Sequence, residues 1–238
     1  MRPVHCVVPA RMGSSRFPGK PLVKLCGREM VLRTLSRAKL AGCFERVICA
    51  TDSEEIFELA RREGFEAVMT PEARTGSDRV AVAAELCGLD LVVNLQGDEP
   101  LADLDLLRDV AKELALHEAS WVSAASPLKP LDAEVESVVK VRAEHGVAKD
   151  FSRRVPVAEL DGWAEHRGIY AYSRSALAEF RGLKRSKREV EEAIEPLRVL
   201  GLREIRIVQT QKPSASVDVP ADVPVLESMI QQEETRCL

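Results

Sequence analysis

The chain lacks the cysteine and histidine patterns of a metal or disulfide framework. Its six cysteines contain no C-x-x-C pair, and several of them lie in apolar runs. Most are therefore predicted to be reduced thiols in the core. The four histidines do not cluster with the cysteines, which argues against a zinc site.

Signals for export or membrane insertion are also missing. The N-terminus runs directly into a strand-like segment without a charged-then-apolar leader, and no apolar run is long enough to cross a bilayer. The net charge of -4 does not favour general binding to nucleic acid or to a membrane surface. We therefore expect a cytoplasmic protein with no nucleic-acid or membrane partner. Any anionic substrate would need a local concentration of Arg and Lys.

Two familiar nucleotide motifs do not occur. The G-x-G of dinucleotide-binding loops is absent, which argues against a dehydrogenase. The Walker pattern needs four residues between its glycines, but residues 14–18 separate Gly13 from Gly19, and Pro21 replaces the hydroxyl residue after Lys20. Pro21 also predicts that Lys20 does not lie inside a helix. No Ser/His/Asp set is evident, so no protein nucleophile is expected.

What is present is an alternation of apolar strand-like runs and amphipathic helical runs in the first half. Expected strands cover residues 4–8, 46–50, 66–69 and 89–95, and expected helices cover 30–40, 54–62, 77–86 and 103–116. Ser53 and Ser77 are predicted to cap two of the helices. This alternation predicts an α/β fold with a mostly parallel, doubly wound sheet.

The second half is less regular. Expected strands cover 121–125, 167–172 and 205–209, and residues 138–142 and 147–151 are expected to form a hairpin. Pro196 should kink or split a helical stretch at 189–200, and Pro220 should open a final helix. No repeat or low-complexity linker divides the chain. We therefore expect one domain over residues 1–238, in which about 126–190 form an inserted lobe.

Residues 9–21 have the composition of a phosphate-binding loop. They follow the first expected strand, and ligands of open α/β sheets lie at the carboxyl ends of strands. Gly13 and Gly19 would let backbone N–H groups approach an anion. Short donors and cations complete the loop, namely Ser14, Ser15, Arg11, Arg16 and Lys20. The alternative, a basic surface loop with turn glycines, does not account for this combination.

Acidic residues and a capped glycine turn supply further candidates. Asp98 ends a buried strand and could hold Mg²⁺, which prefers oxygen ligands and substrate phosphates. Asp218 could be a second ligand, since two distant carboxylates often converge on one metal in phosphoryl chemistry, although taken alone it is more typical of a helix cap than of a ligand. Residues 75–79 could contact a nucleotide or be only a helix cap.

Together these segments resemble the 3-deoxy-manno-octulosonate (Kdo) cytidylyltransferases. The matching segments are 9–11, 19–22, 50–52, 75–79, 94–100, 151–153, 166–170, 197–200 and 217–218. They run in family order over nearly the whole chain. The Gln-Gly-Asp-Glu-Pro segment at 96–100 separates this family from the related sialic-acid cytidylyltransferases.

The resemblance implies a Rossmann-like nucleotidyltransferase, with a mostly parallel sheet flanked by helices and a small inserted lobe for dimerisation and sugar binding. It also implies a homodimer, CTP, Mg²⁺ and the reaction CTP + Kdo → CMP-Kdo + pyrophosphate, a step toward lipopolysaccharide. An acidic sugar is therefore the expected second substrate.

The resemblance also implies roles for individual residues. The catalytic residues would be Arg11, Lys20 and Asp98, and the metal ligands Asp98 and Asp218. The nucleotide would be bound by Pro9, Ala10, Arg11, Gly13, Ser14, Ser15, Lys20, Thr75, Gly76, Ser77, Arg79 and Gln96. The sugar would be surrounded by Gln96, Arg153, His166, Tyr170, Glu192 and Glu195.

Three positions depart from the family pattern, and two of these departures fall where the family binds the sugar. Pro196 stands where the family usually has Gln, residues 154–165 are short, and Val219 replaces the usual Thr. Nucleotidyl transfer is expected to survive these changes, whereas the sugar could be Kdo, its 8-amino form or another acidic sugar. The alternatives are a sugar nucleotidyltransferase that uses UTP or GTP, and a non-catalytic nucleotide-binding regulator on the same fold.

Overall fold

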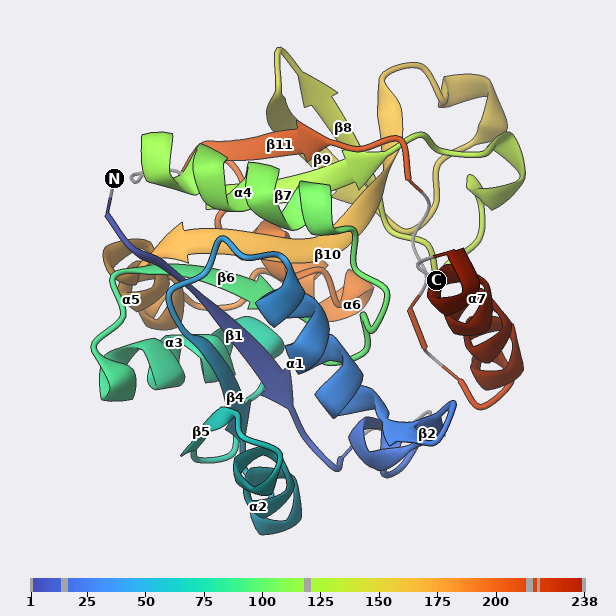
Figure 1. Cartoon of the computed structure of the whole chain (residues 1–238). Coiled ribbons are helices and arrows are strands. Elements are labelled where there is room, and N and C mark those ends of the chain that lie inside the picture. The colour runs from blue at the N-terminus through green and yellow to red at the C-terminus, as the bar shows by residue number, and fades with distance from the viewer. Residues whose placement is uncertain (1, 14–16, 118–120, 213–215, 218, 237–238) are drawn as a thin grey trace.

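A β-sheet forms the centre of the molecule, and helices cover both of its faces (Figure 1). The computed structural model describes residues 2–13, 17–117, 121–212, 216–217 and 219–236. Within these residues nine strands form the main sheet, in the order β5-β4-β1-β6-β10-β7-β11-β9-β8. Their bounds are β1 (Val4–Ala10), β4 (Val47–Thr51), β5 (Glu66–Met69), β6 (Leu91–Leu95), β7 (Trp121–Ser126), β8 (Lys140–Glu144), β9 (Val147–Ser152), β10 (Trp163–Ser173) and β11 (Ile205–Gln209).

Strand direction divides this sheet into two parts. Strands β5, β4, β1 and β6 are all parallel, as the alternating pattern predicts. Strand β10 runs antiparallel to both β6 and β7, and β8 and β9 are antiparallel to their neighbours. Only β7 and β11 are parallel in this second part. The sheet is therefore mixed, and its parallel part carries the first loop and Asp98.

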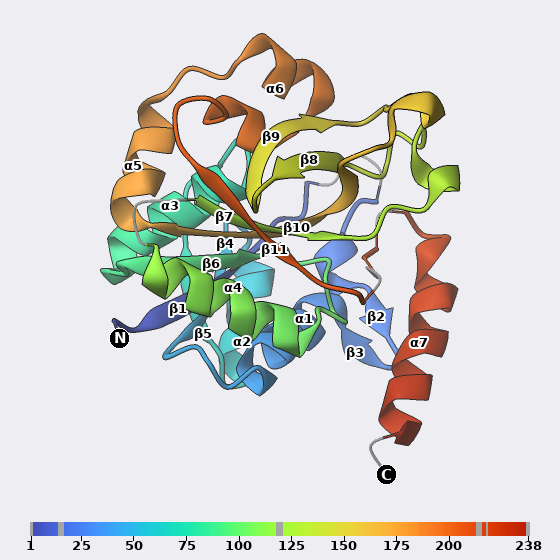
Figure 2. The ribbon, with the colours of Figure 1, turned by 90° about the horizontal axis from the view of Figure 1, so that it is seen from above.

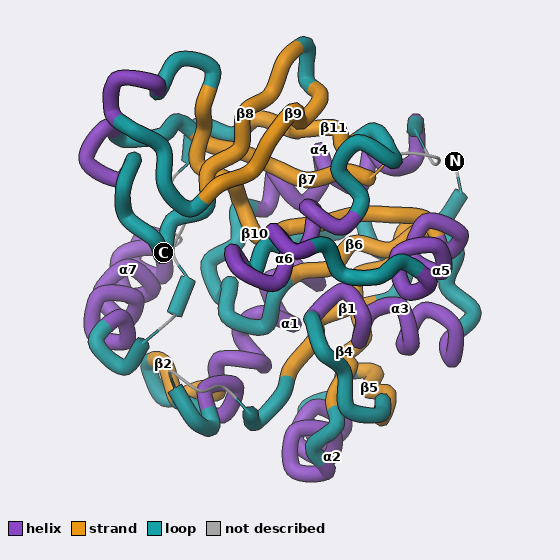
Figure 3. Tube along the Cα trace, turned by 180° about the vertical axis from the view of Figure 1, so that it is seen from behind, coloured by secondary structure: helices purple, strands orange, loops and turns teal. Residues whose placement is uncertain are grey.

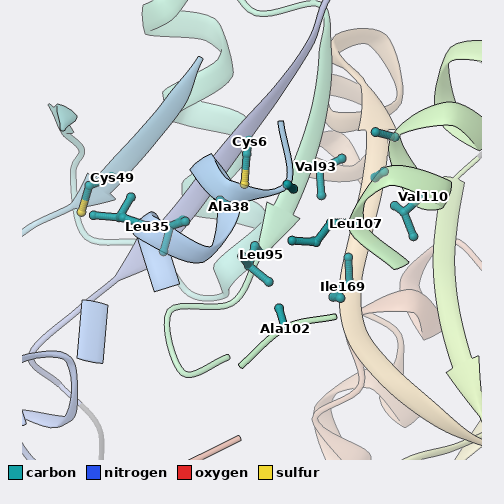
Figure 4. Close-up of a cluster of buried hydrophobic side chains, with 14 of the residues drawn as sticks. Cys6, Leu35, Ala38, Cys49, Val93, Leu95, Ala102, Leu107, Val110 and Ile169 are labelled. Carbon is teal, nitrogen blue, oxygen red and sulfur yellow. The ribbon is translucent and has the colours of Figure 1, made fainter. Parts of the chain in front are cut away.

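The helices cover the two faces and bury separate apolar clusters. Their bounds are α1 (Met30–Leu40), α2 (Glu54–Arg62), α3 (Gly76–Cys87), α4 (Leu104–Leu116), α5 (Arg174–Gly182), α6 (Lys187–Glu192) and α7 (Asp222–Arg236). Helices α1, α2 and α4 supply one cluster, which includes Leu35 and Leu107 (Figure 4). Helices α3 and α5 supply the other, and the view from behind shows them with α6 on the opposite face (Figure 3).

The predicted hairpin is confirmed as β8 and β9. His145 and Gly146 form its two-residue turn with φ of 52° and 76°. Positive φ at both central residues matches the twist of the flanking strands, and glycine adopts it without steric cost. Strands β8 and β9 continue the main sheet beyond β11.

Three local predictions at helix ends have different outcomes. Ser53 caps α2 as expected, but the prediction that Ser77 caps α3 was wrong. Thr75 is the cap, because its Oγ1 accepts a hydrogen bond from Asp78 N at 3.1 Å. Pro196 does split the predicted stretch, since α6 ends at Glu192 and a separate 3₁₀ turn, η4 (Glu195–Arg198), follows.

Helix α7 lies beside a two-stranded ribbon, β2 (Lys24–Leu25) and β3 (Arg28–Glu29), away from the main sheet (Figure 2). It begins two residues after Pro220, close to the expected start. The backbone N–H of Cys26 donates to Glu227 Oε1 at 2.7 Å, which ties α7 to the ribbon. None of the helices in the described segments is both long and apolar enough to cross a membrane.

The described cysteines carry no disulfide. Cys6 and Cys49 are buried, whereas Cys26, Cys43 and Cys87 are partly exposed, and all five are free. No cluster of three or more His, Cys, Asp or Glu side chains suited to a metal occurs in the described part of the chain. The predicted core position is therefore found for Cys6 and Cys49 but not for Cys26, Cys43 and Cys87.

Candidate active site

A cleft of about 370 Å³ opens where the parallel strands β1 and β6 end. Many predicted site residues line it, which places segments far apart in sequence around one space. Those residues are Pro9, Ala10, Arg11, Lys20, Thr75, Gly76, Arg79, Gln96, Asp98 and Glu195. The cleft therefore contains cations, carboxylates and the capped turn of α3 together.

The loop after β6 packs tightly against the end of β1. A Cβ atom at Gly97 would lie 2.8 Å from the carbonyl oxygen of Pro9, closer than real Cβ contacts occur. Thr34 in α1 donates its hydroxyl hydrogen to the Gly97 carbonyl at 3.1 Å. Glycine at this position is what brings Asp98 to the same rim as the first loop.

Lys20 and Asp98 form the central charged pair of the cleft. Gly19, at φ of 72°, turns the chain into a short 3₁₀ helix, η1 (Lys20–Leu22), so Lys20 starts a turn and does not lie inside an α-helix. Its ammonium donates to Asp98 Oδ2 and, at 2.8 Å, to the Val217 carbonyl. Val217 N donates in turn to the Asp98 carbonyl at 3.2 Å. The first loop, the β6 loop and the segment at 217 therefore meet at one point.

Some predicted residues fall outside this arrangement. Ser14, Ser15, Arg16 and Asp218 lie outside the described residues, so their predicted roles stay predictions. Gly13 is described and exposed, and it does not line the cleft.

The N-terminus of α3 forms the opposite wall. The backbone N–H of Ser77 donates to Glu195 Oε2 at 3.1 Å, and burial raises the pKa of the Glu195 carboxyl above its usual range. A Cβ atom at Gly76 would lie 3.0 Å from both Nε2 and Oε1 of Gln96. The absence of a side chain at Gly76 therefore lets Gln96 lie close to the N-terminus of α3.

A chain of buried hydrogen bonds fixes the side chain of Gln96. Its Nε2 donates to Asn94 Oδ1 at 3.1 Å, Asn94 Nδ2 donates to Tyr172 Oη at 2.8 Å, and Tyr172 donates to Ser77 Oγ at 3.2 Å. Asn94, Tyr172 and Ser77 are fully buried. Because each group is held by the next, the Gln96 amide has a preset orientation toward a ligand.

Arg79 forms part of the floor of the cleft. Its side chain is 2% exposed, and its terminal nitrogens donate to Asp52 Oδ2 and Thr70 Oγ1, each at 2.5 Å. Asp52 directly follows β4, so the ion pair between Arg79 and Asp52 connects the end of this parallel strand to the cleft. The terminal nitrogens of Arg79 are therefore held by the protein.

His166 and Tyr170, both predicted to contact sugar, are core residues that do not line the cleft. The His166 ring lies 5.2 Å from Phe151 and 5.5 Å from Tyr170, and its Nε2 is 2.9 Å from Ser123 Oγ. Burial, with Arg167 and Arg153 nearby, lowers the pKa of His166 to about 3. The imidazole is therefore neutral near pH 7.

Arg153 and Glu192 are bonded to each other and also do not line the cleft. Arg153 Nε donates to the Glu192 carbonyl, its backbone N–H donates to Glu192 Oε2 at 3.1 Å, and Nη1 donates to the Glu136 carbonyl at 2.6 Å. These bonds hold the end of α6, beside Ala193 in the cleft wall. The structure thus gives both residues contacts that shape the wall.

Several cleft residues were missed from the sequence. They are Pro21, Met30, Arg74, Gly97, Arg185, Glu189 and Ala193. The i, i+4 spacing of Arg185 and Glu189 could have indicated an ion pair, but not its place in the site. Their position depends on Arg198, which is fully buried and pairs with both Glu189 and Asp78.

The protein is expected to lose stability as the pH falls through a range set by His166. The unfolded chain takes up the proton at a pKa of about 6.5, whereas the folded pKa is about 3. The contribution of the neutral ring to the free energy of unfolding is therefore fully present above about pH 6.5. It is lost as the pH falls toward 3, and the loss is on the order of 3–5 kcal/mol. Urea unfolding at about pH 7 and about pH 4 measures this loss.

The matched variants are His166→Gln and His117→Gln, since His117 is exposed. The first should lose less stability between the two pH values than the wild type, and the second should lose as much as the wild type. A His166→Gln protein with the wild-type pH dependence would contradict the expectation.

Comparison with known proteins assigns the chain to a family. The family described as Cytidylyltransferase matches residues 5–209. A protein named 3-deoxy-manno-octulosonate cytidylyltransferase from Anaeromyxobacter sp. (strain Fw109-5) is 38% identical over 233 residues, which cover 94% of this chain and 95% of the relative. A second protein of the same name, from Alkalilimnicola ehrlichii (strain ATCC BAA-1101 / DSM 17681 / MLHE-1), is 38% identical over 253 residues. This match covers 97% of this chain and 97% of the relative.

A solved structure supports the same assignment. It is described as CMP:2-keto-3-deoxy-manno-octonic acid synthetase complexed with CTP, and it is 30% identical with a TM-score of 0.91 over 98% of this chain and 100% of that one. This likeness confirms the expected Rossmann-like nucleotidyltransferase fold. The chain therefore belongs to the cytidylyltransferases and, within them, to the 3-deoxy-manno-octulosonate cytidylyltransferase family.

Proposed function

We propose that this protein transfers CMP from CTP to the acidic sugar Kdo and releases pyrophosphate. The observation that carries the proposal is the cleft itself, where Arg11, Lys20 and Asp98 lie opposite the N-terminus of α3. A triphosphate needs both cations and N–H donors, and this cleft supplies both. The names of the relatives point to CTP and Kdo as the pair of substrates.

The proposed reaction is an in-line displacement at phosphorus. The C2 hydroxyl of the sugar attacks the α-phosphorus of CTP, a new P–O bond forms, and the bond to the pyrophosphate oxygen breaks. The hydroxyl proton leaves with solvent. Catalysis of such a step depends mainly on positioning and charge stabilisation, so no protein nucleophile is needed.

Lys20 and Arg11 would stabilise the negative charge that develops on pyrophosphate. The ammonium of Lys20 is already fixed by Asp98 and by the Val217 carbonyl, so it would not have to be ordered during the reaction. Arg11 is exposed at the end of β1 and can follow the phosphates as they bind. Gln96, held through Asn94, would present its amide to either substrate.

The residues present fit a magnesium ion. Lys20 takes only Oδ2 of Asp98, and Oδ1 has no hydrogen-bond partner among the residues described. Mg²⁺ is commonly held by one or two carboxylates together with substrate phosphates, so Asp98, with Asp218 as the second ligand, is a suitable set. When bound, the ion would orient the substrate oxygens and acidify the attacking hydroxyl.

The remaining elements of the proposal come from the family. Assembly as a homodimer, a cytoplasmic place of action and a role toward lipopolysaccharide belong to the same hypothesis. The departures at Pro196 and residues 154–165 concern the sugar, so the 8-amino form of Kdo is the nearest second candidate.

Pyrophosphate release from purified protein tests the proposal. CTP, UTP and GTP are each supplied with Mg²⁺ and with a set of acidic sugars that includes Kdo and its 8-amino form. The highest kcat/KM is expected for CTP with Kdo. A higher value for UTP or GTP would favour another sugar nucleotidyltransferase, and CTP binding without pyrophosphate release from any sugar would favour a regulator.

A further inference from the structure

Arg185 is an additional cation in the cleft wall. It lies between α5 and α6, its side chain is 28% exposed, and it lines the same cleft as Lys20 and Asp98. None of the predicted roles includes it. Its place in the wall opposite the first loop raises the question of which acceptor its guanidinium serves.

One edge of Arg185 is fixed by a buried carboxylate. Arg185 Nε donates to Glu189 Oε1 at 3.1 Å, and the Glu189 side chain is fully buried. Arg198 holds the same carboxylate from the other side, with Nη2 at 2.6 Å from Oε1 and Nε at 2.9 Å from Oε2. Ser186 caps α6 by accepting from Glu189 N at 3.0 Å. The anchor of Arg185 is therefore preorganised.

The terminal nitrogens of Arg185 have no hydrogen-bond acceptor among the residues that the structure describes. A guanidinium carries five N–H donors, and only Nε of Arg185 is bonded within the part of the chain that the structure describes. In contrast, Arg198 Nη1 donates to Asp78 Oδ1 at 3.1 Å and to the Phe180 carbonyl at 3.3 Å. The terminal nitrogens of Arg79 likewise donate hydrogen bonds to Asp52 and Thr70. Arg185 keeps Nη1 and Nη2 for a ligand.

We propose that Arg185 is a substrate-binding residue, whose terminal nitrogens donate to an anionic oxygen in the cleft. This rests on the proposed function, because that function brings two anions into the cleft, the triphosphate of the nucleotide and the carboxylate of the sugar. A planar guanidinium recognises either group through two parallel hydrogen bonds. Glu189 is the positioning residue that aims it.

Binding and steady-state measurements on Arg185→Met test the proposal and separate the two anions. A hydrogen bond to a charged group contributes about 1.5–3 kcal/mol, so its loss should weaken binding by ~10-fold or more. If the partner is a phosphate, the Kd for CTP measured by calorimetry without sugar rises by that factor. If the partner is the carboxylate, that Kd is unchanged and the KM for the sugar rises instead, with little change in kcat.

The controls separate binding from a structural role. Arg181→Met removes an exposed arginine that pairs with Glu85 and should change neither constant. Arg185→Lys keeps a cation and should restore part of the lost affinity. If both constants of Arg185→Met stay within about twofold of the wild type, while its unfolding free energy falls, Arg185 is only structural and the proposal is overturned.

The same experiment remains informative if the proposed function fails. Calorimetry with CTP, UTP and GTP on the wild type first identifies the nucleotide that binds, without any need for turnover. Arg185→Met is then compared with the wild type, with that nucleotide and the sugar that supports pyrophosphate release as the ligands. A wild type that uses UTP would overturn the proposed function and leave the role of Arg185 to be decided by the variant.

Discussion

Replacing Asp98 with alanine is expected to lower kcat at least ~100-fold while the protein stays folded, on the scale of one lost transition-state contact. Asp98 lies beside Lys20 and pairs with its ammonium. Its loss would remove both the proposed metal ligand and the carboxylate that fixes the Lys20 ammonium. Pyrophosphate release at saturating CTP and sugar measures kcat. Turnover near the wild-type rate would refute the metal role.

Stability should change little in this variant. The side chains of Lys20 and Asp98 are 14% and 27% exposed, so the loss should be smaller than the about 3–5 kcal/mol found when one partner of a fully buried pair is removed. The matched control is Asp90→Ala, since Asp90 pairs with Arg2 and Arg174 on the surface away from the cleft and should leave kcat unchanged. Asp98→Asn keeps the shape without the charge, so a higher Mg²⁺ requirement in that variant would separate the metal role from that of the lysine.

Replacing Arg198 with methionine is expected to cost about 3–5 kcal/mol of unfolding free energy, the range found when one partner of a buried ion pair is removed. Arg198 has a fully buried side chain, pairs with Glu189 and Asp78, and stacks 3.6 Å from the Phe180 ring centroid. Without it, two carboxylates in the interior lose their main partner. Equilibrium urea unfolding measures the loss.

Two further variants show whether the loss comes from uncompensated charge. Arg174→Met removes an exposed partner of Asp90 and should cost less than about 1 kcal/mol. The double variant Arg198→Met with Glu189→Met removes both charges of the pair and should be more stable than Arg198→Met alone. Equal stability losses for Arg198→Met and Arg174→Met would contradict this account.

The local part of the fold could be predicted from the sequence because its causes are local. Helix α1 occupies the predicted residues, and α2 begins directly after the predicted cap, Ser53. Apolar periodicity and a capping hydroxyl act within one turn, so the sequence contains the whole signal. The loop after β1 and the carboxylate after β6 were placed on one rim by the rule that parallel strands end together.

The errors arose where distant residues decide the outcome. Thr75 and Ser77 are both cap-forming residue types, but Ser77 lies within the first turn of α3, where its hydroxyl accepts a hydrogen bond from Tyr172, 95 positions along the chain. Hydrophobic pattern does not report strand direction, so the antiparallel entry of β10 was not foreseen. Arg185 was not singled out from the sequence, because its anchor Glu189 is held by the buried Arg198, which no local pattern indicates.

The hydrogen bond between Lys20 and the Val217 carbonyl joins positions 197 residues apart. A chain that stops short of residue 217 would contain the first loop, Asp98 and the ion pair between Lys20 and Asp98. It would lack the carbonyl that accepts the second hydrogen bond of the ammonium. The complete geometry around Lys20 therefore requires almost the full length of the chain.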